Sequence, residues 1–421
     1  MLGVRIRPAD DVRAEELAQL TSELVRAKSV NPPGDVTEVV GMIREWLSER
    51  GFSPEAKEYE RGKPNVIARA GSGRPTLILN GHTDVVPPGD ESRWRYPPFS
   101  GKVVDGRVFG RGAADMKGGL AVLMAVFAEL GPAVEREGSG SLVLAATADE
   151  EVGGGAGVKA LVEDGALAGD AAIVAEPTGF DTICIGEKGL CQVRLVARGV
   201  PAHGSLPLLG DNAILKLIRA VGRAQEVVEE LNRDLRPPDE LRDALRDSAR
   251  AYMEGARAPG LGEEDFTRAV GSISFNPGVI RGGSKINVVP DLAELELDMR
   301  LPPGSSPGQV IGRLREALSG LAEVEAIGTS EPNYTPPGEA IVRLVGEGVE
   351  ALGARPRHII MTGATDGRHL RAKGVPTVIY GPGRLTVAHS YNEYVEVSDL
   401  ANTYAVIRGA AARYLGLRLA P

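Results

Sequence analysis

Short apolar segments interleaved with amphipathic ones are the feature that most constrains the fold of this sequence. The apolar segments are bounded by glycine or proline and read NVIARA, TLILNGH, SLVLAATADEE and AAIVAEP. Apolar residues at helical spacing predict helices around them, over Glu15–Lys28, Val36–Arg50, Gly119–Glu129 and Gly157–Asp164. Strands that are apolar on both faces are typical of parallel sheets covered by helices. We therefore predict an α/β domain with a mostly parallel sheet.

The residue pattern changes near Gly186, and the α/β pattern returns after about Tyr334. Between them, LCQVRLVARG, SISFNPG and AELELDMRL alternate apolar and polar residues, as half-exposed antiparallel strands do. Helices predicted over residues 212–228 and 307–318 complete a β-α-β-β-α-β order, which is that of a ferredoxin-like α+β sandwich. The sequence therefore predicts an α/β domain in two parts, 1–186 and 331–421, with an inserted domain at 187–330.

The composition argues against several kinds of partner. A formal net charge of -9 argues against nucleic acid, because phosphate binding needs a surplus of lysine and arginine on one face. We find no apolar segment of the kind that a signal peptide or a membrane span requires, so we expect a cytoplasmic protein without a membrane partner. Cys184 and Cys191 lie in strand-like surroundings and are expected to be buried free thiols. The charged insertion near residues 229–266 is expected to form solvated helices.

A glycine-rich segment, GRVFGRGAADMKGGLAV, raises the question of a phosphate site. It lacks the third glycine of a dinucleotide-binding loop and the Lys-Ser or Lys-Thr pair of a P-loop. Asp115 at its centre would repel an anion and attract a cation. The segment therefore predicts a cation site rather than a nucleotide site.

Candidate metal ligands follow the ends of the predicted strands, where open α/β sheets keep their sites. They are His82, Asp84, Glu176 and the acidic run at residues 149–151, and His389 follows later in VAHSYNEYV. Each of them alone fits an ordinary structural or solvated position. Together, two imidazoles and several carboxylates without cysteine are a ligand set for zinc or a similar ion in a catalytic site. The number of carboxylates favours a centre of two ions bridged by one aspartate.

The sequence resembles the family of dinuclear metal amidohydrolases that contains acetylornithine deacetylase, succinyl-diaminopimelate desuccinylase, aminoacylase, glutamate carboxypeptidases and dipeptidases. The similarity covers nearly the whole chain. The motifs that carry it, in the family's order, are SVNPPG, GHTDVVPPGD, RYPPFSGKVVDGRVFGRGAADMKGG, ATADEEVGG, AEPT, GVPAHGSLPLLGDNAI, INVVPD and AHSYNEYV. The resemblance implies that the two outer parts form a metallopeptidase-like catalytic domain and that the inserted domain serves dimerisation or acts as a lid.

The resemblance also implies two metal ions and their ligands. The ligands would be His82, Asp115 and Glu176 for one ion, and Asp115, Glu151 and His389 for the other. Asp115 would thus bridge the ions, and the Asp115-Met116 peptide is expected to be cis, as in the family. The ions would be zinc, with cobalt or manganese able to replace it.

Two further residues near the ligands would support catalysis in the resembling family. Asp84 would orient the ring of His82, as a metal-bound histidine requires. Glu150 would be the general base that takes a proton from the water bridging the ions, which leaves the attacking hydroxide, and later passes that proton to the leaving amine.

The resemblance places other residues against the substrate. His203 in GVPAHGSLP matches a histidine that reaches the site of the other subunit and helps to hold the oxyanion of the tetrahedral intermediate. Asn287 and Arg300 match positions that hold the substrate carbonyl and α-carboxylate. Gly363 and Arg368, in TGATDGRHL, are expected to bind substrate, and Arg368 would suit a second substrate carboxylate.

We therefore predict a homodimeric metalloenzyme that hydrolyses the amide of an N-acyl amino acid, of the acetylornithine or succinyl-diaminopimelate type. An exopeptidase of the same family, acting on a short peptide, is the main alternative. A metal-binding protein without catalysis is a third hypothesis, but it would have no use for a base at Glu150. His358 and His369 match no ligand position, so we expect them to be ordinary structural or surface histidines.

Overall fold

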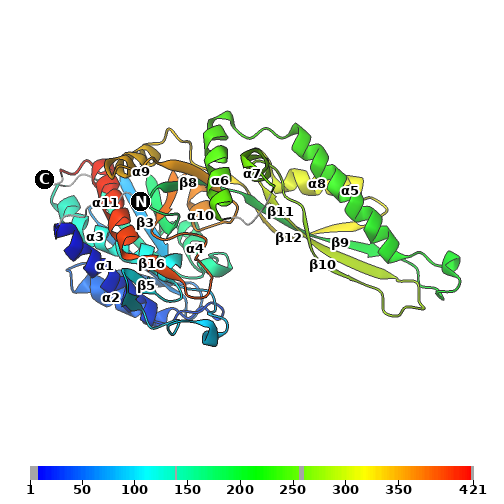
Figure 1. The fold of residues 1–421 in the computed structure, drawn as a ribbon, viewed down its shortest axis with the longest axis horizontal. Coiled ribbons are helices and arrows are strands. Elements are labelled where there is room, and N and C mark those ends of the chain that lie inside the picture. Colours follow the sequence, from blue (N-terminus) through cyan, green and yellow to red (C-terminus); the bar gives the residue numbers. More distant parts are fainter. Residues whose placement is uncertain (1–7, 138–139, 256–259, 419–421) are drawn as a thin grey trace. The chain divides into compact units, whose positions relative to one another are not determined.

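The computed structural model of the 421-residue chain describes residues 8–137, 140–255 and 260–418. The chain divides into two units (Figure 1). The first unit consists of Met1–Ile185, Thr335–Ile359 and Thr365–Pro421, and the second of Gly186–Tyr334 and Ile360–Ala364. The second unit therefore interrupts the sequence of the first.

A nine-stranded sheet contains the apolar segments of the outer parts of the chain, in the order β1-β2-β6-β3-β7-β15-β8-β13, with β14 paired to β8. The strands are β1 Glu55–Glu58, β2 Pro64–Ala70, β3 Thr76–His82, β6 Ser141–Thr147, β7 Ala171–Pro177, β8 Thr182–Glu187, β13 Asn333–Tyr334, β14 Arg357–Met361 and β15 Thr377–Gly381. The central strands β6, β3, β7 and β15 are parallel, and the strands flanking them pair antiparallel. All residues of β6 and β7 are buried, as expected for strands covered on both faces. The predicted fold class is confirmed.

The helices of the first unit pack on this sheet and on one another. They are α1 Pro8–Arg26, α2 Thr37–Ser48, α3 Gly118–Glu137, α4 Val158–Glu163, α9 Ala340–Ala351, α10 Gly367–Arg371 and α11 Val397–Tyr414. α3 contacts β2, β6, β3 and β7, and α1 and α11 contact α3. Among the described residues, the helical stretch Ala113–Glu137 is the one whose length and apolarity would suffice to cross a membrane. Because 72% of its apolar window is buried inside the protein, it has the character of a core helix.

A small three-stranded sheet, which the sequence analysis did not predict, brings distant segments together next to Asp115. β16 (Tyr394–Glu396) pairs with β5 (Arg107–Phe109), and β5 pairs with β4 (Lys102–Val104). Each of these strands has only 3 residues, too few to show a period of two. The pairing sets the segment around His389 beside the glycine-rich segment.

The second unit is built on a four-stranded antiparallel sheet with the order β10-β11-β9-β12. Its elements are β9 Gly189–Arg198, α5 Ala213–Asp234, β10 Asn276–Gly282, β11 Leu292–Leu301, α8 Pro307–Ala317 and β12 Glu323–Ser330. Every second residue of β11 is buried, and α5 and α8 pack on the sheet. The predicted ferredoxin-like order of elements is therefore confirmed.

One predicted strand of the second unit is displaced along the sequence. The alternation in SISFNPG predicts a strand over residues 272–278, but β10 begins at Asn276. The side chain of Asn232 on α5 accepts the N–H of Ile273 at 2.8 Å and donates to its carbonyl at 3.0 Å. Both backbone groups of Ile273 are thus used outside the sheet, so the strand starts later.

The charged insertion is not fully solvated, contrary to the expectation. It forms α6 (Arg242–Gly255) and α7 (Glu263–Val270), which pack against each other. α6 buries one face, with Ala244, Leu245, Ser248 and Ala249. The hydroxyl of Ser248 accepts the N–H of Ile360 at 2.8 Å. The alternating charges of the sequence describe only the outer face of these helices.

Candidate metal centre

Three neighbouring parallel strands carry candidate ligands to one edge of the large sheet. β3 ends at His82, β6 leads into the turn with Glu150 and Glu151, and β7 contains Glu176. His82 lies opposite Thr147 in the ladder, so the ends of β3 and β6 are level. The strand order β6-β3-β7 therefore brings these side chains together, at the edge where α/β sheets hold their sites.

Asp115 lies between two imidazoles. Its Oδ1 is 3.1 Å from Nε2 of His82, and its Oδ2 is 3.1 Å from Nε2 of His389. Glu176 Oε1 lies 3.4 Å from the same nitrogen of His82, and Glu151 Oε2 lies 3.2 Å from the same nitrogen of His389. The side chains thus form two groups that share Asp115, with one of its oxygens facing each group.

The loop that presents Asp115 is held by a carboxylate from the end of the chain. Gly112 adopts a φ of 84°, and the Asp115-Met116 peptide is cis, which confirms that prediction. Glu393, which is buried, accepts the backbone N–H groups of Ala114 and Asp115 at 3.0 and 3.1 Å. The segment that carries His389 therefore also fixes the backbone of the shared aspartate.

The ring of His82 is oriented by the backbone of Asp84 more closely than by its carboxylate. His82 Nδ1 lies 2.9 Å from the carbonyl oxygen of Asp84 and 3.6 Å from its Oδ1. The carboxylate of Asp84 instead accepts the backbone N–H groups of Glu150 and Glu151, each at 3.2 Å, and a side-chain N–H of Asn31 at 2.8 Å. Asp84 thereby joins the His82 ring to the acidic turn.

The acidic run at residues 149–151 has a compensating positive charge in Lys63, which the sequence analysis did not identify. Asp149 has a φ of 70°, and its carboxylate accepts from Lys63 Nζ at 2.7 Å and from the N–H of Ala156 at 3.1 Å. The side chains of Lys63 and Asp149 are only 10% and 7% exposed. Asp149 is thus engaged by structural partners, and the two glutamates that follow it are left for the site.

Lys63→Met is expected to lower the free energy of unfolding by about 3 to 5 kcal/mol, because the Asp149 carboxylate would stay buried without its partner. Lys57→Met is the matched control. Lys57 pairs with Asp164 at 3.0 Å, but these side chains are 38% and 36% exposed, so a loss below about 1 kcal/mol is expected. Urea denaturation measures both variants, and equal losses would contradict the assignment of a buried pair.

Two buried carboxylates of the cluster, Glu176 and Glu150, have a raised proton affinity. Burial and then the charge of Asp115 raise the pKa of Glu176 to about 8. Burial and then the charge of Glu176 raise the pKa of Glu150 well above its ordinary value. Hydrogen bonds to Asp115 and Glu151 raise the pKa of His389 to about 10. A divalent cation would offset the same negative charge and displace these protons, so the donor set fits bound metal ions.

Glu150 lies beside the ligand groups. A carboxylate oxygen of Glu150 and ligand atoms of His82 and Glu176 all lie within 4.8 Å of one another. The ligand atoms of His82, Asp115 and Glu151 form a second group that meets the same distance limit. The position of Glu150 therefore fits a free base next to the ions and also fits an additional ligand. The metal content of a Glu150 variant separates these two roles.

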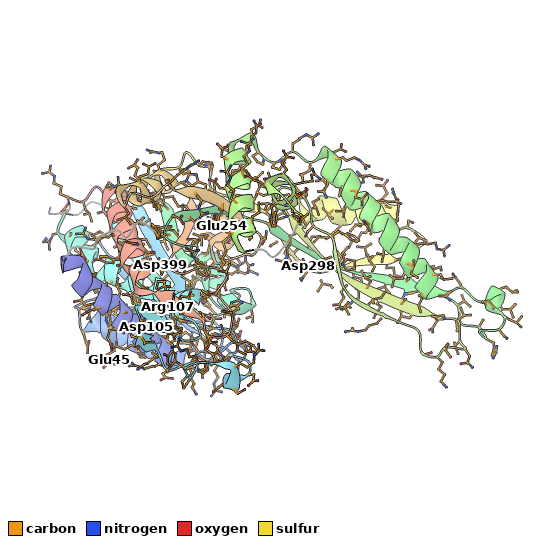
Figure 2. The ribbon with its side chains drawn as sticks, viewed as in Figure 1. Glu45, Asp105, Arg107, Glu254, Asp298 and Asp399 are labelled. Atoms are coloured by element: carbon orange, nitrogen blue, oxygen red, sulfur yellow. The ribbon has the colours of Figure 1, made fainter. Side chains whose placement is uncertain are left out.

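Four residues predicted for catalysis or substrate binding belong to the second unit. His203 and Asn287 lie on loops joined by an isolated backbone bridge between His203 and the residue after Asn287. Arg300, on β11, donates from Nε to the carboxylate of Asp298 at 2.9 Å (Asp298 is labelled in Figure 2). Gly363 is exposed. Within this unit the structure thus brings His203 and Asn287 together.

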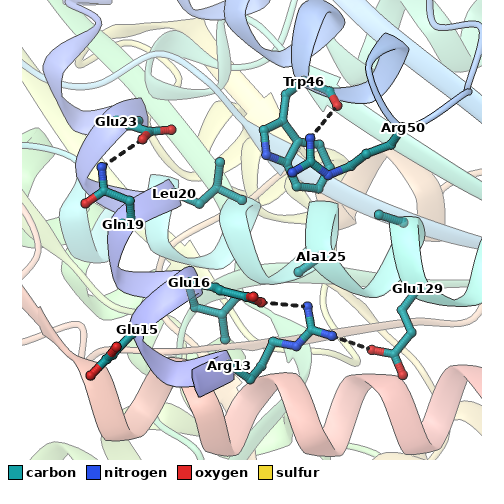
Figure 3. Close-up of a pocket in the computed structure, with 12 residues that line it drawn as sticks. Arg13, Glu15, Glu16, Gln19, Leu20, Glu23, Trp46, Arg50, Ala125 and Glu129 are labelled. Carbon is teal, nitrogen blue, oxygen red and sulfur yellow. Dashed lines mark hydrogen bonds and ion pairs between the residues drawn. The ribbon is translucent and has the colours of Figure 1, made fainter. Parts of the chain in front are cut away.

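A cavity of about 830 Å³ in the first unit is lined by residues of α1 and α3, by Trp46 of α2 and by Arg50 just after α2, and by none of the candidate ligands (Figure 3). Arg13 in its wall pairs with Glu16 at 3.2 Å and with Glu129 at 3.1 Å. Arg50 lies over the ring of Trp46 at 3.8 Å. These charged groups already have partners, whereas the cluster at the sheet edge has the chemistry of a reactive site.

Two imidazoles and buried carboxylates around a shared aspartate, at the carboxyl edge of an α/β sheet, define a metal-dependent hydrolase. The chain belongs to peptidase family M20/M25/M40, whose profile matches residues 78–413. It is therefore a metal-dependent hydrolase of amide bonds.

Relatives and solved structures match the chain over nearly its full length. A succinyl-diaminopimelate desuccinylase of Rhodospirillum centenum is 30% identical, over 94% of this chain and 96% of the relative. An M20 family metallo-carboxypeptidase from Sulfolobus solfataricus has a TM-score of 0.76 at 22% identity, over 96% of this chain and 100% of that one. A dinuclear metal binding peptidase from the M20 family of Bacillus subtilis has a TM-score of 0.64 at 16% identity, over 97% and 100% of the two chains. The two structures establish the shared fold, and the family includes a peptidase with two metal ions.

Proposed function

We propose that this protein hydrolyses the amide bond of an N-acyl amino acid of the N-succinyl-diaminopimelate or N-acetylornithine type. The observation that carries the proposal is the position of Asp115, whose two carboxylate oxygens each face one imidazole at 3.1 Å. The desuccinylase relative at 30% identity supports an acylated amino acid as substrate. An exopeptidase is the second candidate, and the fold shared with a metallo-carboxypeptidase favours it.

Two divalent metal ions complete the proposed site. His82, Asp115 and Glu176 would hold one ion, and Asp115, Glu151 and His389 the other. We propose zinc, with cobalt or manganese able to replace it, because imidazole and carboxylate ligands suit these ions. When bound, the ions polarise the amide carbonyl and lower the pKa of water.

Glu150 is proposed as the general base. The carboxylate takes a proton from the attacking water and passes it to the amide nitrogen, which leaves as a free amino group while the acyl group leaves as a carboxylic acid. Asp84 holds the backbone of Glu150 and thereby its distance from the reacting atoms.

The second unit is proposed to recognise the substrate and to form a homodimer. His203 would stabilise the oxyanion in the site of the other subunit. Asn287 and Arg300 would hold the substrate carbonyl and α-carboxylate. Gly363 would contact the same substrate. We propose a cytoplasmic location.

Assays of metal-loaded protein against N-succinyl-diaminopimelate, N-acetylornithine and a panel of dipeptides test the proposed substrate class. We expect kcat/KM for one of the acylated amino acids to exceed that for every dipeptide by about 100-fold. The reverse order would establish the exopeptidase instead. Metal binding without turnover of any of these compounds would favour the non-catalytic alternative.

A further inference from the structure

Helix α10 contacts the turn of Glu150 through one arginine. Nη2 of Arg368 donates to the carbonyl oxygen of Gly153 at 2.9 Å, at the end of the short 3-10 helix Glu150–Val152. We propose that Arg368 is a positioning residue that holds the turn of the general base, rather than a contact for a second substrate carboxylate. This inference rests on the proposed role of Glu150 as the base.

The contact reaches Glu150 through the backbone of the turn. The N–H of Gly153 donates to the carbonyl of Glu150 at 2.8 Å, while the carbonyl of Gly153 receives Arg368. On the opposite side of the turn, Asp84 accepts the N–H of Glu150 at 3.2 Å. The turn is therefore held at both ends by charged groups, which form stronger hydrogen bonds than neutral ones.

The guanidinium of Arg368 is itself fixed by His369. Nε of Arg368 donates to Nε2 of His369 at 3.2 Å. Burial and then the charge of Arg368 lower the pKa of His369 to about 4, so the ring is neutral. Its Nε2 also lies 3.2 Å from the carbonyl oxygen of Gly153, and it accepts from Arg368 in the tautomer that carries its proton on Nδ1. Arg368 thus spans His369 and Gly153 with two nitrogens of one planar fork, which the single ammonium of a lysine does not reproduce.

Two glycines allow α10 to approach the turn this closely. Gly153 and Gly154 have φ values of 116° and 70°, which residues other than glycine rarely adopt. A Cβ at Gly154 would lie 2.8 Å from Oδ1 of Asp366, the residue before α10. The other oxygen of Asp366 accepts from the hydroxyl of Thr147 at 3.0 Å, at the end of β6. The residues that precede and form α10 are therefore anchored to the strand that leads into the turn.

Hydrogen exchange tests the proposal without an activity assay. In Arg368→Ala, the amides of residues 150–154 should exchange about tenfold faster or more, because a charged hydrogen bond that closes the turn is lost. Arg371→Ala is the matched control, because Arg371 on the same helix donates to the carbonyl of Thr377 at 2.9 Å, on β15. Unchanged exchange in Arg368→Ala would overturn the proposal whatever the activity of the protein.

Kinetics then separate positioning from substrate contact. With N-succinyl-diaminopimelate, which has a second carboxylate on the acyl group, and N-acetylornithine, which has none, Arg368→Ala should lower kcat about 100-fold for every compound that the wild type hydrolyses. KM should change less than about threefold, and Arg371→Ala should leave kcat unchanged. A rise in KM confined to the succinyl compound, at unchanged kcat, would overturn the proposal. If the wild type hydrolyses neither compound, the proposed function fails, while the exchange experiment still decides the role of Arg368.

Discussion

Glu150→Gln should abolish measurable turnover, with kcat lowered by about 10³-fold or more, while the protein keeps two divalent ions per chain. Glutamine has the shape of glutamate but does not accept the proton of the attacking water. The proposed ligands around Asp115 are untouched by the substitution. Steady-state kinetics and elemental analysis of the same preparation measure both quantities.

The neighbouring residue should behave differently, although only one bond separates the two in sequence. Glu151 Oε2 lies 3.2 Å from Nε2 of His389, in the group proposed to hold the second ion. Glu151→Ala should therefore lose metal as well as activity. Glu163→Gln, at an exposed position of α4, is the matched control and should keep both. Equal metal loss in the Glu150 and Glu151 variants would show that Glu150 is a ligand, and fewer than two ions in active wild-type protein would exclude the shared-aspartate scheme.

The sequence predicts the large sheet well because its strands are buried on both faces. β3 and β7 begin and end where the apolar segments TLILNGH and AAIVAEP do. A long segment with one hydrophobic periodicity keeps its predicted secondary structure in the folded protein, whereas a short segment does not. Partners from far along the chain determine the conformation of the short segments. Strand pairing does so for the strands of 3 residues at Arg107 and Tyr394, and a side-chain hydrogen bond does so for the first residues of SISFNPG.

The candidate ligands could be predicted from their positions after strands, but their supports could not. Lys63 is 86 positions from Asp149, and Glu393 is 279 positions from Ala114, whose N–H it accepts. No local pattern marks a lysine or glutamate that will be buried against a distant backbone group. Electrostatic repulsion within the acidic run at residues 149–151 does predict a compensating positive charge. It does not predict which residue supplies that charge, and in the structure this residue is Lys63.

The loops that carry His203 and Asn287 have the surface expected of an interface. Leu208, Leu209 and Ile286 on these loops are 80%, 67% and 106% exposed, which is unusual for large apolar side chains. Every residue of β10 is exposed, and β10 is one of the two edge strands of its sheet. A second copy of the chain that covers these surfaces would place His203 near the contact between subunits.

Hybrid dimers should show whether His203 acts in the site of the other subunit. Homodimers of His203→Ala and of Glu150→Gln should each be inactive. A hybrid of the two chains should recover about half of the wild-type kcat, because one of its sites combines an intact base with an intact histidine. That twofold loss corresponds to roughly 0.4 kcal/mol in the activation barrier. Refolding the two chains together with different tags isolates the hybrid for assay. A chain carrying both substitutions, paired with a wild-type chain, is the matched control and should be inactive, since each of its sites lacks one of the two residues. If His203 serves its own subunit the outcomes exchange: the first hybrid stays inactive, and the control hybrid has half of the activity.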